Sequence, residues 1–177
     1  QKLPKEGFGK IEEAAASLYL NGALREDIEA AIVGENEIAD GASAKLRDIR
    51  REIRDTNARI RAKLNSYVSG ANSKYLQANV ITVRAGRFVL PVRSEYRVQV
   101  PGLIHDRSAS GATLFIEPFS VVEMNNDLRA LQADEQNEIE AILTALSFRA
   151  SECVEGLAKD ADVLAEADRA FALAKYA

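Results

Sequence analysis

The sequence predicts a mainly α-helical protein, with a long antiparallel helical arm that carries a small antiparallel β-sheet at its tip. Two observations support this prediction. Apolar residues recur at three- and four-residue spacing over most of the 177 residues, which is typical of amphipathic helices. The stretch from Asn79 to Pro118 differs, because apolar and polar residues alternate there in short runs, as they do in strands. The sheet is therefore predicted as an insert between two long helices.

Three helices are predicted before the insert. The first runs from Phe8 to Leu20, and the second from Arg25 to Val33. The third is much longer, with Asp40 or Ser43 as its N-cap and an end near Ser69. About 27 helical residues make a rod of about 40 Å, and a rod of that length needs a partner helix to cover its apolar side. Its apolar stripe consists of Leu46, Ile49, Ile53, Ile60, Leu64, Tyr67 and Val68.

The partner helix is predicted to follow the insert. Ser120 and Glu123 form a capping-box pattern, so we expect the returning helix to begin there and to reach about Ser147. Because a compact insert joins the two rods, they are expected to run antiparallel. A final helix is expected from about Ala150 to Tyr176. We divide the chain accordingly into residues 1–72, with the descending helices, residues 73–117, with the sheet, and residues 118–177, with the returning and final helices.

The insert is predicted to hold four strands. Two short runs joined at Ala85-Gly86 predict a β-hairpin, because alternate positions place these apolar residues on one face: Ile81, Val83, Phe88 and Leu90. Two further strands are expected at residues 102–106 and 113–116. The small polar residues 107–111 between them predict a tight loop. The backbone amides of this loop are also candidates for an anion-binding nest, although a simple sharp turn is favoured.

Basic residues distinguish the insert from the helices. The chain as a whole has a net charge of -4, which argues against a uniformly basic nucleic-acid binder. Residues 74–117 hold six basic and three acidic residues, whereas residues 118–177 hold five basic and twelve acidic ones. We interpret the six basic residues of the insert as candidate phosphate contacts, namely Lys74, Arg84, Arg87, Arg93, Arg97 and Arg107. The scarcity of aromatic residues beside them argues against recognition of bases.

Arg84 and Arg87 are predicted to face each other beside the hairpin turn. Like charges in this position destabilise a hairpin, so an anionic partner is one explanation for them. A solvated tip, from which both guanidinium groups swing apart, is the other, and both stay open. If the pair binds phosphates, replacing both residues with Ala is expected to weaken binding and to leave the fold intact.

No catalytic residue and no metal ligand is predicted. His105, Asp106, Ser108 and Ser110 are the residue types of a serine hydrolase, but they lie too close in sequence and lack a G-x-S-x-G elbow. One histidine and one cysteine, Cys153, supply no metal-ligand spacing, and Cys153 is expected to be a small buried side chain. No G-x-x-x-x-G-K-[ST] or G-x-G-x-x-G motif is present, so no bound nucleotide or other cofactor is expected in this chain.

A cytoplasmic location is expected. No apolar run approaches the roughly eighteen residues that cross a bilayer, and no secretory signal is recognisable. The first residue is Gln, and the last amphipathic pattern is unfinished at Ala177, so the sequence reads as a fragment of a longer protein.

The run RAGRFVLPVRSEYRVQVPGLIHDRSASGATLFIEP, followed by VVEMNNDLRAL, resembles the clamp and returning lever of the MutS family, and in particular its bacterial MutS-two branch. GLIHDRSASGATLFIEP is the most specific part of this resemblance. EIADGASAKLRDIRREI is similar to the descending lever of the family, and LAKDADVLAEADRAFALAKYA is similar to its segment leading into the ATPase domain.

The resemblance implies part of an ATP-regulated homodimer whose clamps grip a nucleic acid at the ends of helical levers. ATP, magnesium and an Smr endonuclease domain would belong to the full-length protein. The family is associated with restraint of recombination and with recognition of stalled ribosomes, so the expected partner is DNA, ribosomal RNA or both. The alternative function is a purely structural lever that transmits the state of the ATPase and contacts only protein.

Overall fold

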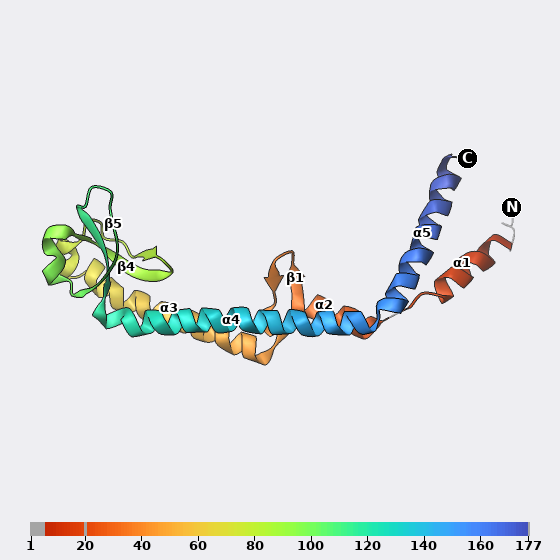
Figure 1. The fold of residues 1–177 in the computed structure, drawn as a ribbon, viewed down its shortest axis with the longest axis horizontal. Coiled ribbons are helices and arrows are strands. Elements are labelled where there is room, and N and C mark those ends of the chain that lie inside the picture. The colour runs from red at the N-terminus through yellow and green to blue at the C-terminus, as the bar shows by residue number, and fades with distance from the viewer. Residues whose placement is uncertain (1–5, 20, 177) are drawn as a thin grey trace. The chain divides into compact units, whose positions relative to one another are not determined.

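The structure is a computed structural model that describes residues 6–19 and 21–176. It is 68% helical, and it contains two small antiparallel sheets, so the prediction of a mainly α fold is confirmed. Residues 40–140 form one compact unit, and the described parts of residues 1–39 and 141–177 form another. The elements of both units are labelled in Figure 1. The division at residues 72/73 and 117/118 stays a prediction.

Helix α3, Ala44–Val68, is the long helix predicted before the insert. It follows the short 3-10 helix η1, Asp40–Ala42. Of the two predicted N-caps, Ser43 is the one used, because its hydroxyl accepts a hydrogen bond from the N–H of Leu46 at 2.9 Å. Thr56, which the predicted stripe omitted, is buried and continues the buried side of the helix.

Helix α4, Phe119–Glu152, is the returning helix. It begins earlier than predicted, so Ser120 lies inside the helix and the predicted start at a capping box is wrong. It also continues past Ser147. The physical reason for the early start is that the preceding strand ends at Pro118 and the helix begins at the next residue, with no intervening turn.

Within residues 40–140, α3 and α4 run antiparallel. Near the start of α3, the hydroxyl of Ser43 donates to Oε1 of Glu138 at 2.8 Å. Toward the other end of α3, Leu64 belongs to the same buried cluster as Leu128, which lies near the start of α4. The end of α3 therefore lies beside the start of α4, as expected for two helices that a compact insert joins (Figure 1).

The insert forms a four-stranded sheet in the order β3-β4-β6-β5, with every neighbouring pair antiparallel. The strands are β3, Thr82–Arg84, β4, Arg87–Arg93, β5, Gly102–Arg107, and β6, Thr113–Pro118. The predicted hairpin and the two further strands are confirmed, and β5 and β6 extend one and two residues beyond their predicted ends.

A two-residue turn joins β3 to β4. Ala85 has φ 49° and Gly86 has φ 74°. Positive φ at both central residues defines the type I′ turn, whose twist matches that of the strands it joins. The turn fixes a register in which Arg84 lies directly opposite Arg87, as predicted.

The two faces of the sheet have different environments. Leu90 pairs with Ile116 and Val92 with Leu114, and these four residues face the core. Strand β5 carries a bulge, because Ile104 also pairs with Ile116 whereas Asp106 pairs with the adjacent Phe115. His105 is therefore an extra residue in β5.

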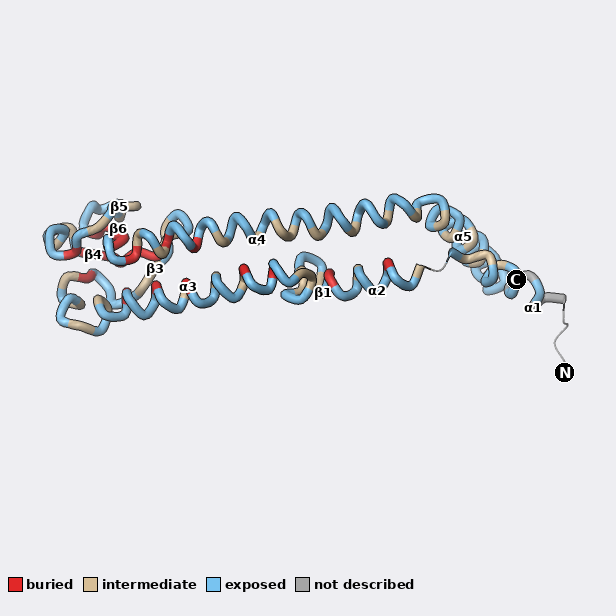
Figure 2. Tube along the Cα trace, turned by 90° about the horizontal axis from the view of Figure 1, so that it is seen from below, coloured by how far each residue is buried: buried red, intermediate tan, exposed pale blue. Residues whose placement is uncertain are grey.

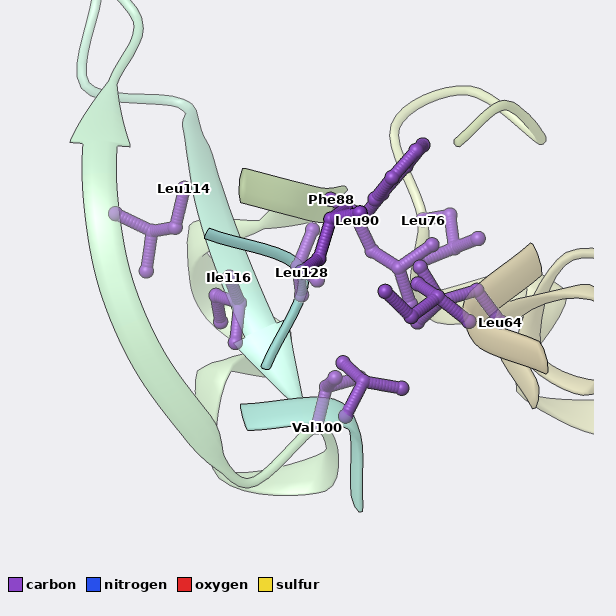
Figure 3. Packing of buried hydrophobic residues seen from close by; sticks show 11 residues of the cluster. Leu64, Leu76, Phe88, Leu90, Val100, Leu114, Ile116 and Leu128 are labelled. Carbon is purple, nitrogen blue, oxygen red and sulfur yellow. The ribbon is translucent and has the colours of Figure 1, made fainter. Parts of the chain in front are cut away.

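Two 3-10 helices close the end of the core. These are η2, Ala71–Tyr75, which follows α3, and η3, Ser94–Gln99, which follows β4. The rings of Tyr75 and Tyr96 lie 5.3 Å apart and join the two segments. Figure 3 shows the buried side chains of the core converging from α3, the sheet and α4. Figure 2 shows that buried residues gather in the sheet and in the adjoining parts of these helices.

The second unit contains α1, Glu6–Ala16, α2, Gly22–Ala31, and α5, Val154–Tyr176, together with the last residues of α4. Helix α1 ends earlier than predicted, and Leu20, its predicted end, lies outside the described residues. A two-stranded ribbon, β1, Ile32–Gly34, and β2, Glu37–Ile38, follows α2. The prediction that only the insert forms sheet is therefore wrong.

Polar contacts hold the elements of this second unit. The Oδ1 of Asn21 accepts from the N–H of Leu24 at 3.0 Å and caps α2, while its Nδ2 donates to Sγ of Cys153 at 3.0 Å. Asp27 pairs with Arg149. Cys153 is half-buried and hydrogen-bonded, whereas the sequence suggested a simple apolar side chain. Within residues 6–19 and 21–176, no helix has the length and apolar character needed to cross a membrane.

Candidate nucleic-acid interface

The six candidate basic residues all lie on the four-stranded sheet or on the short helices beside it. Arg84 ends β3, Arg87 and Arg93 are the first and last residues of β4, and Arg107 ends β5. The other two, Lys74 and Arg97, lie in η2 and η3. The structure therefore gathers all six in one unit, and whether they contact a nucleic acid stays a prediction.

Strand register decides the face on which each arginine lies. Arg87 and Arg93 are six positions apart in β4, so they face the same side of the sheet, and Arg84 joins them because it is opposite Arg87. Arg107 is opposite Leu114, a core residue, so it belongs to the other face at the end of the sheet. Arg93 is opposite Thr113, the first residue of β6, and Arg107 is opposite the second residue, Leu114. The two arginines therefore lie on either side of the start of β6.

Arg87 is held inside the fold. Its guanidinium donates to Oε1 of Glu117 at 2.9 Å and to Oδ1 of Asn126 at 2.6 Å. The Glu117 side chain is 0% exposed and that of Arg87 is 16% exposed. Removing one partner of a buried ion pair typically costs about 3–5 kcal/mol, because the other charge stays buried without compensation. The expectation that Arg87 can be replaced without cost to the fold therefore loses its basis.

Glu117 is the centre of a buried polar network. Besides Arg87, its carboxylate accepts a hydrogen bond from Nδ2 of Asn125 at 2.7 Å and contacts Nε2 of His105. Because Ile104 faces the core opposite Ile116, the next residue, His105, faces the side of the sheet that carries Glu117. The bulge places Asp106 on that side as well, opposite Phe115. Sequence reasoning missed this network. The available signal was a single carboxylate at the end of an apolar strand, Thr113–Pro118.

His105 forms no catalytic relay with the nearby serines. It contacts Glu117, while the hydroxyls of Ser108 and Ser110 lie 3.3 Å from each other. The interpretation of His105 as a hydrogen-bonded strand residue is confirmed. Among the described residues, no group of three or more His, Cys, Asp or Glu side chains is arranged to hold a metal ion.

Arg84 is held much more weakly than Arg87. Its Nε lies 3.3 Å from Oδ2 of Asp106, and the two side chains are 41% and 50% exposed. Its guanidinium carbon also lies 4.2 Å from the ring centroid of Phe115. Exposed ion pairs are typically worth about 0–1 kcal/mol, so a phosphate can compete for this guanidinium. The hairpin arginines therefore differ, although the sequence treated them as a pair.

Arg93 and Arg107 lie at the end of the sheet beside the β5–β6 loop, and Arg97 lies in η3, which begins at that end. We call these three the loop-end arginines. All three are exposed, and no carboxylate of the described residues forms an ion pair with them. Lys74 is exposed as well, with its Nζ 5.1 Å from the ring centroid of Tyr75. The unpaired positive charge of the insert is therefore concentrated at this end and beside it.

Hydrogen bonds within the loop between β5 and β6, and from Ser94 to this loop, order this end of the sheet. The N–H of Gly111 donates to the carbonyl of Ser108 at 2.8 Å, and the N–H of Thr113 donates to the Ser108 hydroxyl at 3.0 Å. Ser94, at the start of η3, donates its N–H to the carbonyl of Ala112 and its hydroxyl to that of Gly111. Gly111 has φ 70° and its N–H closes a turn on Ser108, so the loop forms the predicted sharp turn, and the anion-binding nest stays a prediction.

One further cation and the aromatic rings complete the surroundings of the sheet. The guanidinium of Arg61, on α3, lies 5.1 Å from the ring centroid of Phe88, and sequence reasoning did not single it out. Phe88 itself is buried, Phe115 is covered by Arg84, and Tyr96 packs on Tyr75. Each of these rings is engaged inside the protein, and the absence of base recognition stays a prediction.

Known proteins similar to the chain identify its family. Endonuclease MutS2 of Clostridioides difficile is 50% identical over 166 residues, which are 93% of the chain and 21% of that protein. Endonuclease MutS2 of Clostridium botulinum is 44% identical over 176 residues, 99% of the chain, and that of Clostridium novyi is 50% identical over 172 residues, 97% of the chain; both alignments cover 22% of the relative. No protein-family model matches the chain.

The chain belongs to the MutS family. Within that family, it is homologous to one region of the MutS2 endonucleases, as the sequence resemblance indicated. It spans about a fifth of the length of the curated relatives it matches.

Proposed function

We propose that this chain is the lever and clamp of a MutS2 protein, and that its sheet grips nucleic acid mainly through phosphate contacts. In this proposal α3 and α4 are the lever, and the four-stranded sheet at the end of the pair is the clamp. The partner is duplex DNA during recombination control or ribosomal RNA on stalled ribosomes. Because phosphates are common to both, the binding is not specific for sequence.

The observation that carries this proposal is the distribution of unpaired charge. Residues 74–117 are a positive segment of an acidic chain, and the loop-end arginines extend from it without carboxylate partners among the described residues. On α3 and α4, by contrast, Arg50 is paired with Glu135 at 2.7 Å and Lys45 with Glu138 at 2.9 Å. Helix α3 holds eight basic and three acidic residues, whereas α4 holds two basic and seven acidic ones. An anionic polymer is therefore attracted to the sheet and repelled by α4.

The proposal leaves catalysis to the rest of the MutS2 protein. ATP with magnesium, and the endonuclease activity that the relatives' name states, belong to regions outside this chain. The full-length protein is proposed to act in the cytoplasm as a homodimer, so that two clamps close on one nucleic acid.

A second candidate function is a purely structural lever that contacts only protein. The buried network around Glu117 favours it, because that network ties the sheet firmly to α4 through Asn125. A rigid joint of this kind transmits movement whether or not the sheet touches a nucleic acid.

The deciding experiment is a titration of the chain against duplex DNA and structured RNA at 50 mM and 200 mM salt. Binding through several phosphates should weaken steeply between these concentrations, because each contact releases close to one counterion. The matched control is the triple charge-reversal variant Arg93→Glu/Arg97→Glu/Arg107→Glu, which should abolish binding with an unchanged circular-dichroism spectrum. Absence of binding to either polymer at 50 mM salt would favour the structural lever.

A further inference from the structure

We infer that the phosphates are contacted by the loop-end arginines, and that Arg87 is the internal counter-ion of Glu117 instead of a phosphate ligand. This inference rests on the proposed function and refines it, because it assigns different tasks to residues that are equivalent in charge. Arg84 is intermediate between the two, because its guanidinium can bind a phosphate only if its exposed ion pair with Asp106 is broken.

The argument for Arg87 starts from its partners. Both of its terminal nitrogens are occupied, one by the fully buried Glu117 and the other by Asn126 at 2.6 Å. Turning this guanidinium toward a phosphate would leave the Glu117 carboxylate buried with only His105 and Asn125 beside it. A contact between Arg87 and a phosphate would only replace the ion pair that Arg87 already makes. It would not restore a counter-ion to the buried Glu117 carboxylate.

The argument for the loop end is the opposite one. Arg93, Arg97 and Arg107 break no ion pair when they bind. Strands β4 and β5 are both neighbours of β6, so the backbones at Arg93 and Arg107 are separated by about two strand spacings, roughly 10 Å, and their side chains lie on opposite faces of this end of the sheet. Ser94 ties the start of η3 to the β5–β6 loop, which holds the backbone beside Arg93 in place. Side chains on an ordered backbone lose less entropy on binding than side chains on a mobile one.

The test compares variants of the chain for binding to one DNA duplex across a salt series. Arg93→Ala/Arg97→Ala/Arg107→Ala should lower the affinity at least about tenfold and make the slope of log affinity against log salt shallower by about two to three units. Arg84→Ala should change that slope by about one unit or less. The informative variant for Arg87 is Arg87→Met/Glu117→Gln, which removes both charges of the buried pair together.

The double variant separates a structural role from a binding role. If Arg87 serves only Glu117, Arg87→Met alone should lower the melting temperature, and Arg87→Met/Glu117→Gln should recover it and bind with the wild-type salt slope. A refolded double variant whose slope is shallower by about one unit would show that Arg87 contacts phosphate and would overturn the inference. If the double variant does not fold, the loop-end triple variant still decides, because an unchanged slope there also overturns it. Failure of the unaltered chain to bind would instead reject the proposed function.

Discussion

The side-chain amide of Asn125 binds both backbone polar groups of Phe88. Its Oδ1 accepts from the Phe88 N–H at 3.1 Å, and its Nδ2 donates to the Phe88 carbonyl at 3.1 Å. A single side chain of α4 thereby takes the place of a neighbouring strand at this position of β4. The same Nδ2 also reaches Glu117, so one buried amide joins the helix to two strands.

Replacing Asn125 with Leu should therefore be severely destabilising. The substitution removes the partners of two buried backbone groups and one partner of a buried carboxylate. Each unsatisfied buried group costs about 1–3 kcal/mol, so we expect a loss above about 3 kcal/mol in the free energy of unfolding measured with urea. Asn126→Ala is the matched control, because Asn126 is exposed and its side chain accepts one hydrogen bond, from Arg87. Equal losses in the two variants would contradict this account of Asn125.

Gly102 should not tolerate a side chain. A Cβ added there would lie 2.1 Å from the carbonyl oxygen of Glu117, in the paired strand β6. Backbone cannot yield as a flexible side chain can, so Gly102→Ala should separate β5 from β6 and cost more than about 2 kcal/mol. Gly41→Ala provides the comparison, since an added Cβ there meets no atom within 4 Å. Thermal denaturation of the two variants checks the prediction, and equal melting temperatures would refute it.

The contact between α3 and Glu138 should make stability depend on acid pH. Hydrogen bonds from Lys45 and then from Ser43 hold the pKa of the Glu138 carboxyl below its ordinary value of 4.5. A carboxyl whose pKa is lower in the folded state stabilises the fold above its ordinary pKa, and this contribution is lost as the pH falls through the folded value. Glu138→Gln should therefore lower the free energy of unfolding at pH 7. Near pH 3 the unaltered chain has lost the same contribution, so the two chains should differ less in stability. A difference that is the same at both pH values in urea titrations would exclude this role.

Purified chain should neither bind nor hydrolyse ATP. Such chemistry requires a glycine-rich phosphate loop with its lysine and a hydroxyl that holds the metal, and the sequence has no such motif. Isothermal titration with ATP and magnesium should give no saturable heat. Turnover that persists through an additional purification step would reject the assignment of ATP chemistry to other regions of the MutS2 protein.

Local patterns in the sequence were sufficient for much of the fold. The stripe of α3, its Ser43 cap and the hairpin turn at Ala85-Gly86 depend on residues a few positions apart, and each is present in the structure. The direct passage from β6 into α4 was not foreseen, because a capping-box pattern beginning at Ser120 has the same residue types whether or not it caps a helix.

The candidate site was less accessible to sequence reasoning. The six basic residues were found from composition, but the state of each one depends on partners far away in the chain. Arg87 and Glu117 are 30 positions apart, and Phe88 and Asn125 are 37 apart. No periodicity connects residues at such separations. The distinction between an arginine that is held and one that is free therefore required the tertiary structure.

The extra residue in β5 makes the length of this strand as important as its composition. Without His105, Asp106 would follow Ile104 in the regular alternation, still opposite Phe115, and Arg107 would stay opposite Leu114. Deleting this residue would thus leave the strand pairing intact and would still remove one partner of the buried Glu117 carboxylate. During divergence, β5 should accept exchanges of side chains far more readily than insertions or deletions, so descendants of this sequence should keep the spacing between Gly102 and Thr113 even where the residues between them change.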